Sequence, residues 1–341
     1  MILNIQFLRA YAAIIVVLYH AAKLVADYGF SYRNLSWLTF SVGDWGAFGV
    51  DLFFVISGYI MFMINDKRPQ TPVEFITNRV KRIVPLYWVL TFLIGFLFLI
   101  MPSAFRNLEV NLEHIISSLF FISNHFNYDY PSLYVGWTLE YEMFFYLVFG
   151  MILFLKNIKP IQQILLLTFI FSISITFDLS KSIIFEFVYG GVLFIIFKKH
   201  DVLSRLGNNN YWWILGIAAS IFVVIPDSVE NFRHIFWGVP AALIFISIML
   251  VKEIKFNFIQ KLGDASYSIY LIQVFTLPLF CKILSKFALG VNAFFIFLLI
   301  SLLTIISGYV CYLIVERNLN SLLKYKFNFQ KKPHTDQVTK S

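Results

Sequence analysis

The dominant pattern along the chain is a series of long apolar runs separated by short polar segments. Most runs approach the roughly 20 apolar residues that a helix needs to cross a hydrocarbon core about 30 Å thick. They lack the strict apolar–polar alternation of barrel strands, and backbone groups in lipid must be satisfied within their own segment. The pattern therefore predicts an all-α integral membrane protein with about ten transmembrane helices in one bundle. The expected spans lie at 5–25, 46–64, 84–101, 135–155, 161–177, 183–197, 211–226, 234–251, 266–285 and 292–314.

The composition excludes an ordinary water-soluble domain. Hydrophobic residues make up 59% of the 341 residues, charged residues only 13%, and the mean hydropathy is +0.76. Soluble domains carry about 25% charged and about 45–50% apolar residues. The two cysteines, Cys281 and Cys311, fall inside expected spans, which favours helix packing over a disulfide.

The distribution of basic residues predicts an orientation. Of the 27 Lys and Arg residues, 19 lie in one set of alternate loops together with the tail, and five lie in the loops of the opposite side. The positive-inside rule then places both termini in the cytoplasm. On this basis we divide the chain into a transmembrane domain at 1–316 and a basic cytoplasmic tail at 317–341. Since the basic residues flank helices, the net charge of +8 indicates anionic lipid as a partner and no nucleic acid.

A charge inside an expected span is costly and usually functional, and on this ground we take Arg9, His20, Asp51 and Glu142 as candidates. Arg9 and His20 are eleven residues apart, so they share nearly one helix face and lie about 17 Å apart along the axis. In this orientation Arg9 lies near the inner surface, and His20 lies in the outer half at a depth similar to Asp51 and Glu142. Histidine is the commonest general base, and a carboxylate often orients it. We therefore predict a catalytic group of His20, Asp51 and Glu142.

Structural roles remain open for the same residues. His20 could hydrogen-bond a neighbouring helix, and Arg9 could extend its charge to the headgroups. Asp51 could cap the start of a helix. Glu142 could make a structural bond to Trp137 or to a tyrosine.

A basic cluster at Arg79, Lys81 and Arg82 precedes the third span. Arg79 and Arg82 are three residues apart and share a helix face. A guanidinium fork suits phosphate oxygens better than an ammonium group does. From spacing alone, however, ordinary positive-inside topology is the better explanation of the cluster.

At these residues the chain resembles the acyltransferase family 3 membrane proteins, which acylate bacterial surface polysaccharides. It is most similar to the short, exopolysaccharide-type members without an extra hydrolase-like domain. The resemblance covers nearly the whole chain, with one departure, Gln273, where the family often has histidine, so a catalytic role for the ninth span stays open. The five matching motifs are Arg9 to His20, Gly49 to Tyr59, Arg79 and Arg82 with Pro85, Trp137-Thr138-Leu139 with Glu142, and Leu262 to Leu271.

The resemblance implies a membrane-bound O-acyltransferase of the bacterial cytoplasmic membrane. It implies acyl-coenzyme A, usually acetyl-coenzyme A, as the donor substrate, with no permanently bound cofactor. It also implies that His20 is the catalytic base and that Arg79 and Arg82 bind the phosphates of the donor. The expected acceptor is a hydroxyl of a cell-surface or lipid-linked glycan, and residues 1–316 form the acyltransferase domain.

This layout permits a mechanism across the membrane. Arg79, Arg82 and Arg9 would hold the coenzyme at the cytoplasmic face, and its pantetheine arm would pass Ser57, Gly58 and Tyr59, where small residues allow helices or the arm to approach closely. The acyl group then passes directly to the hydroxyl, or rests first on Ser57 or His20, and the sequence leaves both routes open.

The longest expected outer loop, at 102–134, is rich in aromatic and polar residues that suit a sugar-binding rim or interfacial anchoring. His114 and His125 in this loop lack the spacing of a metal site, so we predict no metal. Its other polar and aromatic residues are Asn124, Asn127, Tyr128, Asp129, Tyr130 and Tyr134.

Two other functions fit a polytopic bundle with buried charges. One is a transporter or flippase of a glycan or lipid precursor. The other is a non-catalytic subunit of a polysaccharide assembly complex, which would tolerate the loss of His20 or Glu142. Formation of a covalent ester distinguishes the acyltransferase from both.

Overall fold

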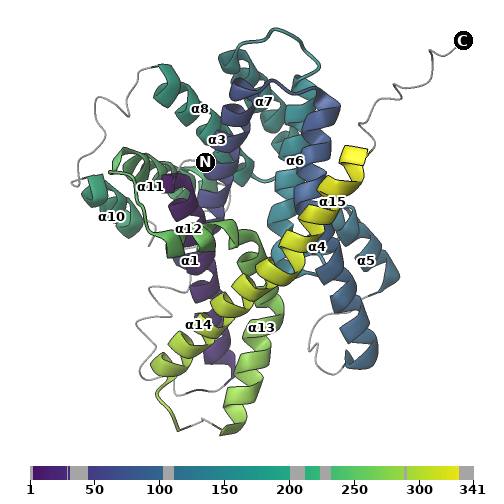
Figure 1. Cartoon of the computed structure of the whole chain (residues 1–341), viewed down its shortest axis with the longest axis vertical. Helices are drawn as coiled ribbons and strands as arrows, with labels where there is room; N and C mark the ends of the chain where they lie inside the picture. Colours follow the sequence, from purple (N-terminus) through teal and green to yellow (C-terminus); the bar gives the residue numbers. More distant parts are fainter. Residues whose placement is uncertain are drawn as a thin grey trace, which may run out of the picture.

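The computed structural model describes residues 3–28, 30, 45–102, 111–199, 212–222, 232–287 and 290–329, and these residues form helices and turns without strands (Figure 1). The all-α expectation is thus confirmed for this part of the chain. The helices of more than one short turn are α1 (Leu3–Asp27), α3 (Phe48–Lys67), α4 (Pro72–Ile100), α5 (Leu112–Leu119), α6 (Trp137–Ile152), α7 (Pro160–Thr176), α8 (Phe185–Lys199), α10 (Trp212–Phe222), α11 (Val239–Leu250), α12 (Asn257–Asp264), α13 (Ser266–Phe287), α14 (Ala293–Cys311) and α15 (Arg317–Phe329).

Several of these helices are membrane spans by length and composition. Within the described residues, five helical segments are long and apolar enough to cross a bilayer. On α4, large apolar side chains such as Phe92, Phe96 and Leu99 are exposed, as expected for lipid-facing positions. The chain is therefore a multi-pass membrane protein. The five segments are Leu3–Asp27, Phe48–Lys67, Pro72–Ile100, Ser266–Phe287 and Ala293–Leu323.

The total of ten spans and the cytoplasmic termini stay predictions. Two further apolar helices, Pro160–Thr176 and His234–Leu250, are shorter. The predicted span at 211–226 is described only from 212 to 222, and the loop cations Arg33 and Arg106 lie outside the described residues.

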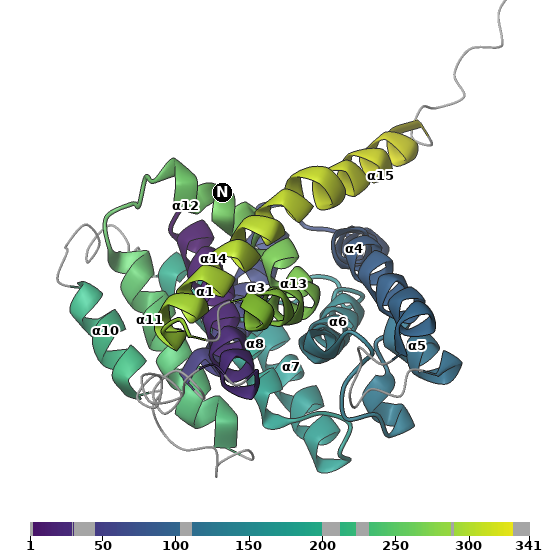
Figure 2. The same ribbon diagram turned by 90° about the horizontal axis from the view of Figure 1, so that it is seen from below.

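Helix α1 occupies the centre of the bundle, between α3, α11, α12, α13 and α14 (Figures 1 and 2). Its buried face is rich in alanine, which lets neighbouring backbones approach closely. Near its start, the side-chain amide of Asn4 donates to the carbonyl oxygens of Ile248 (2.7 Å) and Val251 (3.1 Å). These bonds tie the first helix to the end of α11.

Glycines set the closest helix crossings. A β-carbon at Gly58 would lie 2.1 Å from the carbonyl oxygen of Phe187, and one at Gly190 would lie 2.2 Å from that of Val55. Helices α3 and α8 therefore pack backbone against backbone. Of the two possibilities raised by the small residues near Gly58, the structure shows helix packing at this position.

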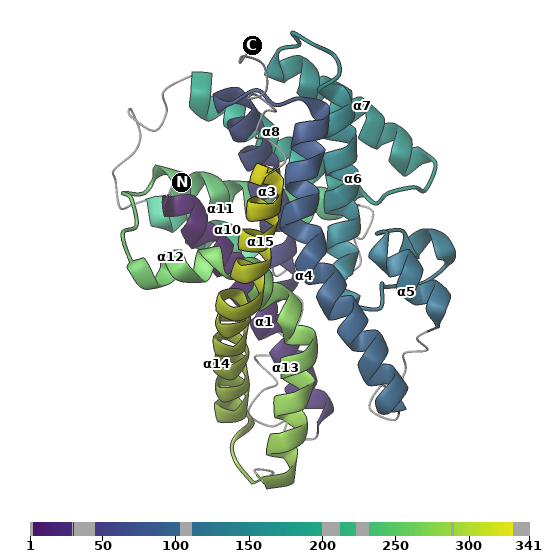
Figure 3. The ribbon, with the colours of Figure 1, turned by 45° about the vertical axis from the view of Figure 1, so that its right-hand side comes forward.

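The last three helices form a hairpin whose second arm is one long continuous element. Helices α13 and α14 lie side by side as a hairpin, and α14 continues through a π-helical segment, Tyr312–Glu316, into α15 (Figure 3). Helix α15 projects beyond the bundle (Figure 2). The predicted basic tail at 317–341 thus begins as a helix that extends to Phe329.

Candidate functional site

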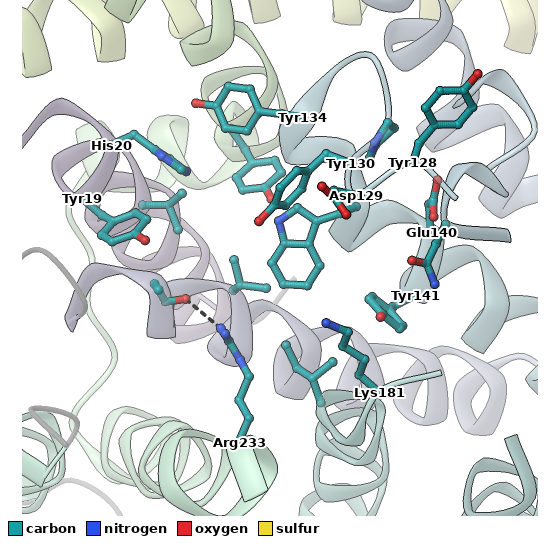
Figure 4. Close-up of a pocket in the computed structure, with 18 residues that line it drawn as sticks. Tyr19, His20, Tyr128, Asp129, Tyr130, Tyr134, Glu140, Tyr141, Lys181 and Arg233 are labelled. Atoms are coloured by element: carbon teal, nitrogen blue, oxygen red, sulfur yellow. Dashed lines mark hydrogen bonds between the residues drawn. The ribbon is translucent and has the colours of Figure 1, made fainter. Parts of the chain in front are cut away.

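A cavity of about 490 Å³ contains His20, and we name it the His20 cavity. Figure 4 shows His20, Tyr19 and Tyr134 on one side of it, with Glu140, Tyr141 and Lys181 on the other. Tyrosines and polar groups dominate the wall, which suits a sugar, whose faces are apolar and whose edges are hydroxyls. The lining residues are Val16, Tyr19, His20, Ala47, Val50, Asn124, Tyr128, Asp129, Tyr130, Pro131, Tyr134, Trp137, Glu140, Tyr141, Lys181, Ile183, Arg233 and Tyr270.

Two tyrosine rings surround His20. Its ring centroid lies 4.8 Å from that of Tyr19 and 5.4 Å from that of Tyr134, and both contacts are edge-on. Tyr134 precedes α6 in a single 3-10 turn, and burial raises the pKa of its hydroxyl above the ordinary value. The imidazole is half-buried. Its orientation is set mainly by packing against these rings.

A second cavity of about 170 Å³ contains Arg9, Arg79 and Arg82, and we name it the arginine cavity. Helices α1, α3, α4, α6 and α13 contribute to it, and its wall is apolar apart from the arginines and a few polar groups. The lining residues are Arg9, Val50, Phe53, Phe54, Ile56, Ser57, Ile60, Met61, Ile64, Arg79, Arg82, Ile83, Thr138, Leu139, Glu142, Tyr146, Ser266, Tyr267 and Tyr270.

Glu142 belongs to the arginine cavity. Its Oε1 accepts hydrogen bonds from the hydroxyls of Ser57 (2.9 Å) and Tyr146 (2.5 Å). Arg9 donates to the side-chain oxygen of Gln6 (3.1 Å). The Nε of Arg79 is buried and has no hydrogen-bond partner among the residues that the structure describes. The cavity therefore combines three cationic side chains with one carboxyl group.

Asp51 forms a buried ion pair. Its two carboxylate oxygens accept from Nε (3.0 Å) and Nη2 (2.8 Å) of Arg233, and the Asp51 side chain is fully buried. Arg233 also stacks over the ring of Trp237, 4.3 Å from its centroid. Burial alone would lower the pKa of Arg233, but the Asp51 carboxylate outweighs this effect and the pKa is raised.

The two cavities meet at two residues. Among the described residues, Val50 of α3 and Tyr270 of α13 are the ones that line both, and we name this pair the partition. The hydroxyl of Tyr270 donates to the carbonyl oxygen of Val135 (2.9 Å) and lies 2.9 Å from the hydroxyl oxygen of Thr138. The partition thus separates His20 from the three arginines.

The structure groups the predicted site residues differently from the sequence analysis. Arg9, Arg79, Arg82, Ser57 and Glu142 lie together in the arginine cavity, as the donor-binding hypothesis requires for all but Glu142. His20 lines the other cavity.

Asp51 and Tyr59 line neither cavity. Both oxygens of Asp51 are engaged by Arg233. Tyr59 is buried in an aromatic cluster, with its ring centroid 4.9 Å from that of Phe245. Asp51 therefore does not orient His20 in this arrangement, and Tyr59 does not line the cavity in which the donor arm was expected.

The residues of the predicted sugar-binding rim also fall into two groups, those that line the His20 cavity and those that do not. Asn124, Tyr128, Asp129, Tyr130 and Tyr134 line the His20 cavity. His114 is buried under the ring of Tyr128, with 4.1 Å between centroids, so it supports the rim from below. His125 and Asn127 are exposed outside the lining.

Arg233, Glu186 and Tyr270 were not among the predicted site residues, although Tyr270 lies in the matching motif Leu262 to Leu271. Glu186 is fully buried beside Gly238, and neither carboxyl oxygen has a hydrogen-bond partner among the described residues. It falls inside the predicted span at 183–197, so the search for ionisable residues at membrane depth could have found it. Arg233 was counted only as a loop cation, because nothing in its local sequence points to Asp51.

This architecture is that of a helical membrane protein with two chemically distinct cavities that share Val50 and Tyr270 in their linings. Residues 2–313 match the family model of the acyltransferase domain that defines acyltransferase family 3. The chain therefore belongs to this family, and the resemblance seen in the motifs is confirmed.

Two relatives illustrate the range of the family. The chain is 35% identical over 294 residues to the exopolysaccharide production protein ExoZ of Rhizobium meliloti, covering 80% of this chain and 89% of ExoZ. It is 23% identical over 361 aligned positions to the O-acetyltransferase OatA of Staphylococcus aureus, covering 91% of this chain and 55% of OatA. The chain thus spans about half the length of OatA. No solved structure matches the chain.

Proposed function

We propose that this protein is an O-acyltransferase of the bacterial cytoplasmic membrane. It transfers an acyl group, typically acetyl, from acyl-coenzyme A to a hydroxyl of a cell-surface or lipid-linked glycan. Family membership supports acyl transfer, the relative OatA supports O-acetylation, and the relative ExoZ supports a polysaccharide acceptor.

The arginine cavity supports an anionic donor. Coenzyme A carries several phosphate groups, and arginine binds phosphate oxygens through charge-assisted, bidentate hydrogen bonds. Arg82 is exposed at this cavity, whereas Arg9 is buried within it. The phosphates would bind near Arg82 and Arg79, and the arm would extend past Ser57 toward the partition. A ligand oxygen at Arg79 would also satisfy its unpaired Nε.

The His20 cavity supports an alcohol acceptor. The side chains of Asp129, Tyr130 and Lys181 are exposed at its edge, so a large glycan can enter with only one residue inside. Tyrosine rings offer flat surfaces for a sugar ring, and carboxylates accept bonds from its hydroxyls. Among the described residues that line this cavity, His20 carries the one imidazole.

The proposed reaction joins the two cavities. An imidazole nitrogen of His20 takes the proton of the acceptor hydroxyl while that oxygen attacks the thioester carbonyl carbon. The carbon–oxygen bond forms, the carbon–sulfur bond breaks, and the coenzyme leaves as a thiolate that receives the proton from the imidazolium. If the acyl group is first carried by Ser57 or His20, the same transfer takes place in two steps, with the same bonds formed and broken overall.

The observation that carries the proposal is the meeting of an arginine-lined cavity and a histidine-containing cavity at Val50 and Tyr270. A general base on one side of this partition and a phosphate-binding cluster on the other match the two ends of the reaction.

The test uses purified protein in lipid nanodiscs with acetyl-coenzyme A labelled in the acetyl group and an exopolysaccharide oligosaccharide. We expect a labelled ester on the oligosaccharide and release of free coenzyme thiol. Movement of a glycan or lipid precursor across the membrane without any ester would favour the transporter instead.

A further inference from the structure

We propose that Tyr270 determines acyl-chain length, by restricting the partition to short acyl groups such as acetyl. This inference rests on the proposed function, because it concerns how the acyl group of the donor reaches the hydroxyl beside His20. Val50 is the other residue that lines both cavities.

The first step of the argument is the fixed position of the Tyr270 ring. Its hydroxyl end is held by the carbonyl of Val135 and lies beside the hydroxyl of Thr138, each at 2.9 Å. Its flank packs edge-on against Phe53, with 6.0 Å between centroids. Tyr270 and Val50 are each only 6% exposed. Because the ring is held at its tip and along its side, it cannot yield to a bulky group without losing these contacts.

The second step is the size of the space on the donor side. The arginine cavity is about 170 Å³, whereas pockets for drug-sized ligands occupy about 300–1,000 Å³. The pantetheine arm alone would fill a space of this size. The acyl group would therefore have to lie at the partition rather than fold back beside the arm.

The third step is what lies beyond the partition. A longer acyl chain could extend only into the His20 cavity, next to Trp137 and His20. That is the space which the acceptor hydroxyl must occupy for the attack on the carbonyl carbon. An acetyl group ends at a single methyl and leaves this space free. A long acyl chain would have to push Val50 and Tyr270 apart and would also displace the acceptor. The geometry therefore disfavours long acyl groups.

The inference is tested first by acyl-length profiles. Ester formation is measured with acetyl-, butyryl- and octanoyl-coenzyme A for the wild type, Val50→Ala, Tyr270→Ala and Tyr270→Phe. We expect the wild type to prefer acetyl. Val50→Ala and Tyr270→Ala should raise the octanoyl-to-acetyl ratio by about tenfold or more, which is the lower end of what a methylene-sized change in a pocket produces. Tyr270→Phe keeps the ring but loses the hydroxyl contacts at its tip, so it should relax the preference for acetyl less than Tyr270→Ala does.

The matched control is Tyr130→Ala, which removes a tyrosine that lines the His20 cavity but not the arginine cavity. It should leave the acyl-length profile unchanged, whatever its effect on the acceptor. The inference is overturned when Val50→Ala and Tyr270→Ala still make ester but retain the wild-type profile. Val50→Ala is a smaller change, so it still tests the inference if Tyr270→Ala fails to fold.

A second measurement tests the partition without catalysis. Leu139 lines the arginine cavity, and Leu139→Cys is made in a background where Cys281 and Cys311 are replaced by alanine. A membrane-impermeant maleimide is applied to each side of sealed vesicles. We expect labelling from one side when Tyr270 is present and from both sides in Tyr270→Ala. Labelling from both sides with Tyr270 in place would refute the partition, and this result would stand even when no ester forms and the proposed function fails.

Discussion

The His20 cavity and the arginine cavity differ in size and wall chemistry, although helices α1, α3, α6 and α13 contribute to both. The first is about 490 Å³ and lined by tyrosines and polar groups, and the second is about 170 Å³ and lined by arginines and apolar residues. On α1, Arg9 faces one cavity and His20 the other. On α6, Trp137 and Glu142 divide in the same way. Chemical function therefore changes along each helix axis rather than between domains.

This difference teaches how one bundle can serve two unlike reactants. A phosphate-bearing thioester and a glycan need opposite walls, one cationic and narrow, the other broad and rich in hydrogen-bonding groups. In the proposed reaction, the two walls would keep each reactant on its own side of the membrane. Only the reacting atoms would have to meet, at Val50 and Tyr270.

The largest expected effect comes from removing the base of the His20 cavity. His20→Ala should lower the rate of ester formation by about 10²–10⁴-fold, the usual contribution of general-base catalysis. The amount of protein in the membrane fraction should stay normal. His125→Ala, an exposed histidine outside the cavity lining, is the matched control and should retain activity. Near-normal turnover by His20→Ala would show that the two cavities do not divide the chemistry as proposed.

The next effect concerns the wall of the His20 cavity. Asp51→Asn leaves the largely buried Arg233 without its ion-pair partner, so the free energy of unfolding should fall by up to about 3–5 kcal/mol. Asp66→Asn, at the exposed pair with Lys198, should cost less than about 1 kcal/mol. Thermal unfolding in detergent measures both, and adding Arg233→Gln to Asp51→Asn should recover part of the loss. Equal, small effects of the two substitutions would mean that the buried pair does not hold this wall.

A smaller effect should appear on the donor side alone. Arg79→Gln should raise the KM for acetyl-coenzyme A by about 10- to 100-fold, because one charge-assisted hydrogen bond contributes about 1.5–3 kcal/mol. The KM for the oligosaccharide should not change, and Arg79→Lys should recover only part of the donor affinity. Lys261→Gln removes an exposed cation outside both linings and should leave both constants unchanged. An increase confined to the oligosaccharide would reverse the assignment of the cavities.

The smallest effect should appear on the acceptor side alone. Tyr130→Ala removes an exposed aromatic ring from the His20 cavity and should raise the KM for the oligosaccharide by a factor of about 2 to 10. The KM for acetyl-coenzyme A should stay constant. Phe126→Ala, a neighbouring exposed aromatic residue outside the lining, serves as the control. Equal effects of both substitutions would favour general anchoring at the membrane interface over sugar binding.

Much of the fold could be predicted because lipid imposes a simple rule on the sequence. Apolar runs of spanning length must be helices, and the long helices α1, α3, α4, α13 and α14 all lie on predicted runs. The shorter helices α5 and α12 were not expected as separate elements, because they are brief and only partly apolar. Periodicity identifies a helix, but it does not show where a loop folds back into a single turn.

Several predicted site residues line the two cavities, but the sequence did not predict how they are arranged. Helical spacing correctly separated Arg9 from His20, which lie in different cavities. Depth alone suggested that Asp51 and Glu142 approach His20, yet Arg233 engages one, and Ser57 and Tyr146 bond the other. Depth along the membrane normal says nothing about the direction in which a side chain points around its helix. Long-range partners such as Arg233 are fixed only by tertiary packing.

The close helix crossings have a consequence for turnover. Helix α3 is locked to α8 through Gly58, and α13 is locked to α14 through Gly308, where a β-carbon would lie 2.6 Å from the Cα of Ile269. These contacts brace the two backbones that carry Val50 and Tyr270. Any widening of the passage should then be a ring rotation, a far smaller and faster event than the microsecond-to-millisecond shifts of whole helices. Under the proposed function, the protein would act as a stationary frame that transfers an acyl group across the bilayer without alternating between inward-facing and outward-facing shapes.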